Sequence, residues 1–553
     1  MHCRWIAGPT ALAVIVTLAN AIKPVLVDDT AYLAYARQMA AHPLDPYGFT
    51  IHWYTVPEPA MDVLAPPVVP YWLALGMRLF GEHILLLKLW LFPFVWIFAR
   101  SLGGLLRRFA RGSEGIALPL IVLSPAVLPM VNLMLDVPAA ALALASLAVF
   151  TQRRTLRSAD SASRLIAIVA GLLAGLAMQT KYTAMLVPAA IAWYGLTHRQ
   201  LRLAILACVM SVLVFASWEV LLFLKYGESH FLHHVAEQQA ATGNWLQEKS
   251  ALIPGLVGHL GLLGFGIALF AARSMGLSNR KLIPIAILWC IGTGLVAILA
   301  SDVIRARNVW RPFGTGVLLV ALVGAGSLIL KKRRLRLSRG SWFVAGWLLL
   351  ELAGYFVLTP FPAGRRVIGF TIVFGIVAAR LLSRIHRIRP ERTPPRWLLP
   401  FAIAISALFA ALDTFDAYPE KVLAERAAVE LRGEKRVWFA GHWGFQFYCE
   451  RAGMMPIIPW QSDFQAGDML VLPLHPDDRG FYRPHIGSLP VQLPTSFVEL
   501  ATVLEWDDWL SAQTVPNFYG GSEPIVGRDH PRLRLVIYRV TRACNRGRIQ
   551  VLP

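Results

Sequence analysis

The sequence predicts a polytopic α-helical membrane protein with a small α/β domain at its C-terminal end. Hydrophobic residues occupy 56% of the 553 positions, only 16% are charged, and the mean hydropathy is +0.53. A soluble protein needs charged residues at about a quarter of its positions to cover its surface. The composition therefore disfavours a purely soluble enzyme, and the high hydrophobic content excludes a disordered chain.

The distribution of charge separates the two predicted parts. The chain has a net charge of +20, which by itself would suggest a nucleic-acid partner. Residues 413–553 hold 15 basic and 17 acidic residues, a net of −2, so residues 1–412 carry a net of +22. The positive excess lies wholly in the hydrophobic part, where it is explained by loop topology, and we expect no nucleic-acid binding.

Thirteen apolar runs are candidates for membrane spans, by length and hydropathy. They lie at 5–27, 83–106, 116–134, 137–150, 164–180, 183–197, 201–225, 251–271, 282–300, 314–330, 341–358, 366–382 and 397–412. The first run could be a signal peptide, because Ala19-Asn20-Ala21 has the small-residue pattern of a cleavage site. Since the apolar sequence continues to Val27, we expect a retained helix instead.

Every second connection between these runs is basic. The basic connections lie at 107–111, 153–164, 198–202, 273–281, 331–336 and 380–396. The positive-inside rule places them in the cytoplasm together with the N-terminus, and it places everything after 412 outside. We therefore expect a protein of the bacterial inner membrane with a periplasmic or extracellular C-terminal domain. The first outer loop then runs from 28 to 82 and contains interfacial helices. This topology requires that its short segment 66–80 is an interfacial or re-entrant helix rather than a span.

The C-terminal region, 413–553, has no run of span length. Three short β-like stretches lie at 436–440, 468–472 and 533–539, and Gly, Pro and Asp separate them. The aromatic stretch 441–448 could stack on a sugar, but it is better explained as the core of this domain. Cys449 and Cys544 could form a disulfide in an oxidising compartment or remain two free thiols.

Two acidic positions lie on the predicted outer side. Asp28 and Asp29 directly follow the first apolar run, and they could act as a general base, as metal ligands or as solvated residues at the start of a loop. Asp136 interrupts apolar sequence, where an ionisable residue facing lipid is costly. It could be a turn residue, but a functional role is favoured because Asp28 and Asp136 share one face of the membrane.

Basic residues on the same outer side are candidates for phosphate binding. Lys181 ends a Gly/Ala-rich run, and it could bind a phosphate or extend to water. Arg365 and Arg366 open a later run from the outer side. Arginines at 305, 307 and 311 lie outside against the positive-inside rule, which suggests an anion, although each one alone could simply be solvated.

Three histidines in the fourth outer loop are the weak candidates for a metal site. His230, His233 and His234 have the i, i+3, i+4 spacing of one helix face, with Glu228 and Glu237 nearby. The H-E-x-x-H pattern of zinc proteases is absent. An exposed polar loop is the favoured interpretation, and a divalent metal remains an open possibility.

These motifs occur in an order that resembles the GT-C glycosyltransferases. The order is Asp28-Asp29-x-x-Tyr32, then Ala65-Pro66-Pro67-x-x-x-Tyr71-Trp72 and Leu79-Phe80-Gly81, then Asp136, then Gly171 to Lys181. More narrowly, it is similar to family 39/83, which contains the protein O-mannosyltransferases and the lipid A aminoarabinose transferase. The resemblance covers 1–200 well and 300–385 loosely. The sequence departs from the family pattern at Ala31, Ala65 and Val367, which leaves the acceptor and the details of phosphate binding undefined.

The resemblance implies a GT-C transmembrane domain at 1–412 and a C-terminal domain at 413–553. It implies transfer of a sugar from a polyprenyl-phosphate carrier to a lipid, glycan or protein acceptor on the outer face. Asp28 would match the catalytic acidic position, as the general base, and Asp29 its acidic neighbour, so the two form the expected catalytic set. Lys181, Arg365 and Arg366 would lie near the donor phosphate, and Tyr32, Asp136 and Arg305 complete the expected substrate-binding set. One base and a good leaving group suffice for inversion in a single step.

Two other classes of function compete with this interpretation. A transporter or a flippase for lipid-linked sugars would also have many spans, with charged residues along its path. The candidate charges, however, gather at one membrane face rather than at the midplane. A receptor or assembly protein that binds through its C-terminal domain is the third class.

Overall fold

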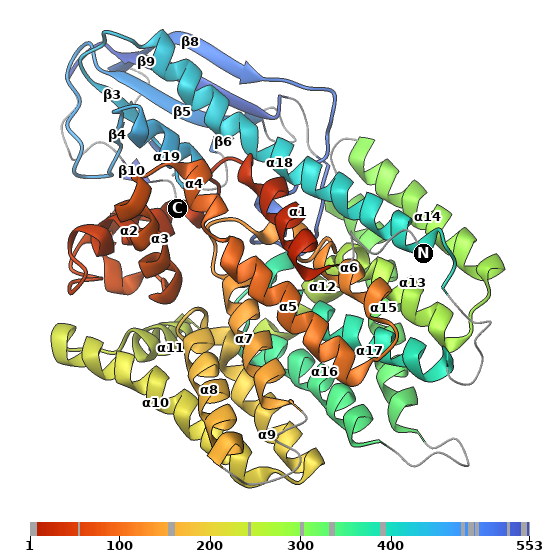
Figure 1. Ribbon diagram of the computed structural model, residues 1–553. Coiled ribbons are helices and arrows are strands. Elements are labelled where there is room, and N and C mark those ends of the chain that lie inside the picture. Colours follow the sequence, from red (N-terminus) through yellow and green to blue (C-terminus); the bar gives the residue numbers. More distant parts are fainter. Residues whose placement is uncertain are drawn as a thin grey trace.

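The computed structural model describes residues 8–553, apart from 54–55, 153–160, 242–244, 299–302, 331–337, 387–393, 477–481, 485–490, 493–496, 528–530, 544–549 and 552–553. Helices dominate the first three quarters of the chain, and strands are concentrated in the last quarter (Figure 1). The predicted pairing of Cys449 with Cys544 lies outside the described residues, because Cys544 is among those left out.

The helices of the first outer loop and of the bundle follow one another with short connections. They are α1 (Pro9–Ala21), α2 (Asp29–Ala41), η1 (Ala60–Asp62), α3 (Val68–Phe80), α4 (Ile84–Leu89), α5 (Phe92–Phe109), α6 (Glu114–Val122), η2 (Leu128–Met130), α7 (Asp136–Phe150), α8 (Ser161–Met178), η4 (Tyr182–Met185), α9 (Leu186–His198), α10 (Leu201–Tyr226), α11 (His230–Ala241), α12 (Trp245–Leu263), α13 (Phe265–Met275), α14 (Asn279–Ile298), α15 (Val303–Ile329), α16 (Arg339–Leu358), η5 (Gly364–Val367), α17 (Ile368–His386) and α18 (Leu398–Glu430). A hairpin of β1 (Thr50–His52) and β2 (Pro57–Pro59) lies in the first outer loop.

Eight spans among the described residues are long and apolar enough to cross a membrane. They lie at 84–109, 161–178, 201–226, 279–298, 307–329, 339–358, 364–385 and 398–430. A ninth forms if α12 and α13, which meet at a bend of 76°, count as one span. Large apolar side chains on these helices are exposed, as on α10, where Phe223 is 57% and Leu224 75% exposed. Surfaces of this kind are expected to face lipid, so the chain is a helical membrane protein.

The predicted count of thirteen spans is not established by these helices. Three of the runs correspond to shorter helices, since α1 and α9 have 13 residues each and α7 has 15. The run at 116–134 contains only the nine-residue α6 and then η2, because Pro119, Pro125 and Pro129 interrupt it. The segment at 66–80 forms the 13-residue α3, which is too short to cross a bilayer unless the bilayer thins locally.

The C-terminal part contains a mixed sheet with strand order β4-β3-β5-β9-β8, and β6 pairs with β5. Its elements are β3 (Val437–Phe439), α19 (Trp443–Arg451), β4 (Met455–Pro456), β5 (Met469–Pro476), β6 (Tyr482–Pro484), β8 (Val498–Trp506), α20 (Val515–Phe518) and β9 (Leu533–Val540). Separately, β7 (Val491–Gln492) pairs with β10 (Gln550–Val551). The three predicted β-like stretches correspond to β3, β5 and β9, so those strand predictions are confirmed. In the aromatic stretch 441–448, Phe445, Phe447 and Tyr448 are buried on α19, as a core interpretation requires.

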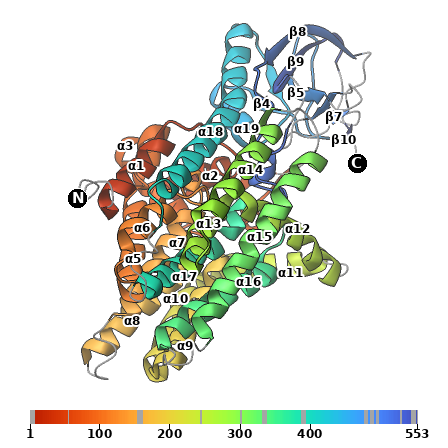
Figure 2. The same cartoon turned by 90° about the vertical axis from the view of Figure 1, so that its right-hand side faces the viewer.

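One long helix joins the two parts of the molecule. The 33-residue α18 runs from the membrane bundle to the sheet without a break at the predicted boundary of 412/413 (Figures 1 and 2). On the sheet side, Phe415 contacts Trp506 of β8 with ring centroids 6.3 Å apart. The helix therefore belongs structurally to both parts.

A buried ion pair connects α18 to the end of α1. The Lys23 ammonium group pairs with the Asp413 carboxylate, and both side chains are fully buried. Lys23 Nζ also donates to the Pro129 carbonyl at 2.9 Å, and the Tyr519 hydroxyl donates to Asp413 at 2.9 Å. A buried charge pair is tolerated when hydrogen bonds satisfy its remaining groups, as they do at this site.

We predict that Asp413→Ala destabilises the protein by about 3–5 kcal/mol, because it leaves the Lys23 ammonium group buried without a counter-charge. The matched control is the double variant Lys23→Met/Asp413→Leu, which removes both charges and keeps the volume. It is expected to unfold close to the wild type. Thermal unfolding in a neutral detergent measures both. An equal loss in the two variants would contradict an electrostatic role for this pair.

Candidate active site

The candidate site is built around the loop that joins α1 to α2. Lys88 Nζ donates to the Lys23 carbonyl at 2.6 Å and to the Pro24 carbonyl at 3.2 Å. The Val25 N–H donates to the Tyr448 hydroxyl at 2.9 Å. Both the membrane bundle and the C-terminal part therefore fix this loop.

The backbone is strained at the residue just before the first candidate carboxylate. Val27 has φ of +44°, in the left-handed region that a β-branched residue rarely adopts. Such a conformation costs on the order of 1–3 kcal/mol, and it persists only where surrounding contacts impose it. The bonds to Lys88 and Tyr448 supply such contacts, and the result is a sharp turn that delivers Asp28 to the start of α2.

Asp28 is ion-paired with Arg365. Asp28 precedes α2, and Arg365 lies in η5 at the start of the last part of the bundle. A guanidinium nitrogen of Arg365 pairs with the Asp28 carboxylate, whose side chain is 18% exposed, against 10% for Arg365. These residues are 337 positions apart, so only the tertiary fold brings them together.

Asp136 is ion-paired with Lys181 in the same region. Asp136 is the first residue of α7, and Lys181 follows the end of α8. Burial lowers the pKa of Lys181 to about 8, and Arg366 and Arg365 add to that effect while Asp136 opposes it. The ammonium group is thus charged at neutral pH but close to its titration.

The two pairs form one ionic cluster together with Arg366 and Tyr32. Asp28, Asp136, Arg365 and Arg366 all act electrostatically on the Tyr32 hydroxyl, whose pKa is raised well above its usual range, mainly by burial. Lys181 interacts with Asp136, Arg365 and Arg366. Counting formal charges, three cations meet two carboxylates, so the cluster has an excess of one positive charge.

Arg366 supplies that excess. Its guanidinium lies 5.0 Å from the centroid of the Phe361 ring, and its buried Nε has no hydrogen-bond partner among the described residues. The Nε of Arg365 is likewise buried and without a partner there. A buried guanidinium donor without an acceptor requires an explanation, and an oxyanion ligand is the acceptor that suits its geometry.

Asp29 is placed differently from Asp28. It is fully buried, and its Oδ2 accepts a weak 3.4 Å bond from the Leu26 N–H. Burial raises its pKa to about 6, and Lys88 and Lys23 oppose the rise. Asp29 thus faces the lysines beneath the loop, whereas Asp28 faces the cationic cluster.

The arginines of α15 contact another part of the molecule. Arg311 pairs with Glu523 of the C-terminal part at 3.0 Å, and Arg307 approaches the same carboxylate at 3.9 Å. The ion pair with Glu523 accounts for these two arginines more simply than the anion ligand that the sequence suggests. The side chain of Arg305 lies outside the described part of the chain.

The three candidate histidines do not all contact the same side chains. His230 is buried and lies 2.6 Å from the Tyr182 hydroxyl, and burial lowers its pKa to about 3. His234 lies 3.2 Å from Glu237 and 3.3 Å from His230. The expected exposed polar loop is corrected, because the three residues lie on helix α11 and His230 is buried, whereas a metal site of three histidines stays a prediction.

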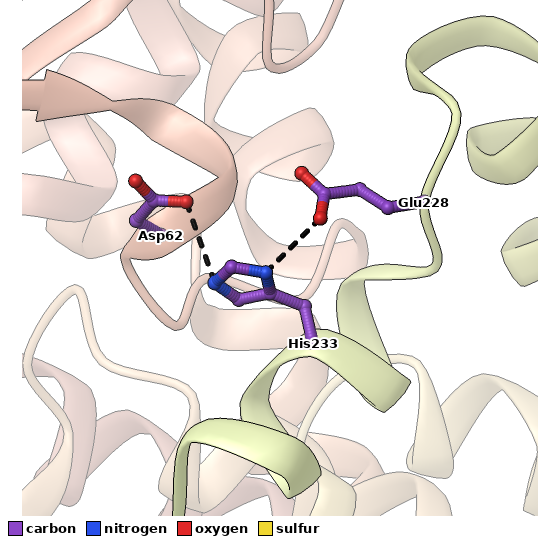
Figure 3. Close-up of side chains that lie close together, drawn as sticks. All are labelled: Asp62, Glu228 and His233. Carbon is purple, nitrogen blue, oxygen red and sulfur yellow. Dashed lines mark hydrogen bonds and ion pairs between the residues drawn. The ribbon is translucent and has the colours of Figure 1, made fainter.

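His233 instead joins two carboxylates that come from different loops. Its Nε2 lies 3.3 Å from Asp62 of η1, and its Nδ1 lies 3.1 Å from Glu228, which precedes α11 (Figure 3). One ligand atom from each residue falls within 4.8 Å of the others, so the group could hold a metal ion. Direct contacts of the imidazole with the two carboxylates explain the same geometry without a metal.

Sequence reasoning missed several residues that position the site. Lys23 and Lys88 interrupt apolar runs, and a charge within apolar sequence is the signal that could have identified them. Asp413, Tyr448 and Tyr519 carried no such signal, because their importance comes from contacts with the distant first loop.

Two solved structures align with most of this chain at low sequence identity. The crystal structure of ArnT from Cupriavidus metallidurans bound to undecaprenyl phosphate is 16% identical, covers 85% of this chain and 93% of its own, and has a TM-score of 0.41. The oligosaccharyltransferase AglB from Archaeoglobus fulgidus, in complex with an inhibitory peptide and a dolichol-phosphate, is 12% identical, with 83% of this chain and 65% of that chain covered and a TM-score of 0.45. Both are GT-C glycosyltransferases, the kind of protein that the sequence resembles. No family model and no curated protein matches the sequence.

We predict that, if Asp62, Glu228 and His233 bind a metal ion, added divalent cations stabilise the folded protein. Adding Zn²⁺ or Mn²⁺ to chelator-treated protein should raise the midpoint of thermal unfolding, and His233→Ala should abolish the rise. His234→Ala, whose ring lies outside the group, is the matched control and should keep it. No shift in the wild type would contradict a metal site at this group.

Proposed function

We propose that the protein is a membrane glycosyltransferase that moves a sugar from a polyprenyl-phosphate-linked donor to a lipid, glycan or protein acceptor on the outer face of the membrane. The observation that supports this most directly is the ionic cluster of Asp28, Asp136, Lys181, Arg365 and Arg366. It combines a carboxylate that can act as a base with cations that exceed the available carboxylates. It lies at the ends of apolar helices, where the phosphate of a lipid carrier would lie.

The chemistry requires each of these groups. When the donor reacts, the bond from the anomeric carbon to the phosphate oxygen breaks, and its electron pair stays on the phosphate. Positive charge grows on the sugar ring, as in other glycosyl transfers. Arg365, Arg366 and Lys181 stabilise the negative charge on the departing phosphate, because fixed cations in a water-poor site act without reorganisation.

Asp28 serves as the general base. Its carboxylate removes the proton of the acceptor hydroxyl while the hydroxyl oxygen bonds to the anomeric carbon from the face opposite the phosphate. This route inverts the anomeric configuration in one step. Asp136 holds Lys181 in place, and the buried Asp29 orients the loop beneath the base rather than touching the substrate.

The Asp28–Arg365 pair suggests how donor binding prepares the base. A phosphate that binds Arg365 and Arg366 competes with Asp28 for the same guanidinium. Release from Arg365 leaves the Asp28 carboxylate free to accept a hydrogen bond from the acceptor hydroxyl. The donor itself thereby converts a stable ion pair into a base that is ready to react.

The concentration of these charges at one end of the bundle favours transfer over transport. A transporter or flippase needs polar residues along its path through the membrane. Incubation of purified protein with radiolabelled polyprenyl-phosphate sugars separates the two classes: an enzyme breaks the sugar–phosphate bond, whereas a flippase moves the intact donor between leaflets.

We predict that Asp28→Asn lowers transfer at least about 100-fold, because general base catalysis contributes roughly 10²–10⁴ in rate. The variant should insert and elute from a sizing column as the wild type does. Glu425→Gln, which removes an exposed carboxylate from α18, is the control and should remain active. Full activity of Asp28→Asn on any donor that the wild type uses would refute the assignment of the base.

We also predict that binding of the donor weakens at alkaline pH, and that this weakening depends on Lys181. The pKa of this ammonium group is lowered to about 8, so it is charged below that pH and loses its proton above it. The KM for the donor should therefore rise as pH increases through about 8, by up to about tenfold per pH unit. Lys181→Arg keeps its charge and should flatten this rise. Asp136→Asn removes the carboxylate that raises the pKa, and it should move the rise to lower pH.

An unchanged alkaline rise in Lys181→Arg would assign the titration to another group. Steady-state kinetics from pH 6.5 to 9.5 on all three proteins provide the comparison.

A further inference from the structure

A cavity lined by arginines lies at the far end of α7 from the ionic cluster. It has a volume of about 750 Å³, and its lining comes from α5, the start of α6 and the end of α7. The first residue of α7 is Asp136 of the ionic cluster, and the lining residues Ala145, Ala148 and Val149 lie near its last. At 1.5 Å per residue, roughly 15–20 Å of helix separates the two sites.

Four arginines line this cavity: Arg100, Arg107, Arg108 and Arg111. The single lining carboxylate is Glu114, whose Oε2 accepts the Gly112 N–H at 2.8 Å. Within the described ranges, no ion pair joins any of the four guanidinium groups to a carboxylate. Arg108 alone has a side-chain partner there, a 3.3 Å bond to the Tyr194 hydroxyl.

Part of the remaining wall of the cavity is apolar. Gly104 of α5 and Ala145, Ala148 and Val149 of α7 form this part, and Ser101, Thr151 and Gln152 complete the lining. In Figures 1 and 2 this end of α5 and α7 lies away from the C-terminal sheet. A cationic opening beside an apolar wall at the end of membrane helices matches the head and chain of an anionic phospholipid.

We propose that this cavity binds the phosphate headgroup of an anionic membrane phospholipid, with the first part of an acyl chain against α5 and α7. Guanidinium groups bind phosphate through paired hydrogen bonds, and basic pockets between helix ends are a recurrent site for anionic lipids. The positive-inside rule requires basic residues near helix ends, but it does not require that four of them line one cavity with an apolar wall.

The site is independent of the proposed transfer reaction. Its occupant would bridge α5 and α7 and would stabilise their packing, so its measure is lipid binding and stability rather than catalysis. A soluble phosphate or pyrophosphate shares the headgroup chemistry and lacks the acyl chain, which separates the two sources in an experiment.

The test is a titration of purified protein in neutral detergent, followed by native mass spectrometry, with phosphatidylglycerol, phosphatidylcholine and inorganic pyrophosphate as probes. We expect the wild type to bind phosphatidylglycerol more tightly than the other two. The variant R107Q/R111Q should weaken that binding roughly 25-fold, at about fivefold for each arginine near a membrane surface.

The matched control is R199Q/R202Q, which removes two exposed arginines from another basic loop outside the cavity. It should bind phosphatidylglycerol as the wild type does. If R107Q/R111Q fails to insert, R107K/R111K keeps the charges and loses the paired hydrogen bonds, so it should bind with intermediate affinity. No preference for phosphatidylglycerol in the wild type, equal weakening in the control, or equal binding of pyrophosphate would each overturn the proposal.

Discussion

The buried ion pair of Lys23 and Asp413 is the contact on which the arrangement of the site depends. It fixes the end of α1 to the middle of α18, the helix that belongs to both the bundle and the sheet. The Lys23 carbonyl in turn accepts from Lys88, so one residue links the C-terminal part to the loop that carries Asp28. Buried charges are costly unless paired, so this pair helps to fix the loop in which the contacts of Lys88 and Tyr448 hold the strained turn at Val27.

The ionic cluster contains two internal ion pairs, but it has one more cation than it has carboxylates. Asp28–Arg365 and Asp136–Lys181 neutralise four charges, while Arg366 keeps a buried donor without a partner among the described residues. In the proposed reaction, the donor phosphate would bind at this excess cation and would release Asp28 from its ion pair. Catalytic groups that are paired before the substrate arrives are protected from water and held close to their working positions.

Both proposed ligands are phosphates, and each is expected at an end of the same short helix. The start of α7 holds Asp136 in the ionic cluster, and its last turns form a wall of the arginine-lined cavity. The two sites differ in their carboxylates. The cluster contains two that are ion-paired to its cations, as a base and its support require, whereas the only carboxylate of the cavity is bonded to a backbone N–H. The ion-paired carboxylates of the cluster suit a catalytic base, whereas the arrangement of the cavity suits the binding of an anion.

The sequence by itself determined the membrane class, the position of strands β3, β5 and β9, and the individual residues Asp28, Asp136, Lys181, Arg365 and Arg366 as candidates, because hydropathy, alternation and misplaced charge are local signals. Tertiary structure alone decided how these residues pair and that Asp29 faces away from Asp28. It also decided which side chains the three histidines contact and that Arg311 pairs with Glu523. The physical reason is that these contacts join residues up to several hundred positions apart, and no periodicity along the chain records which charge will face which.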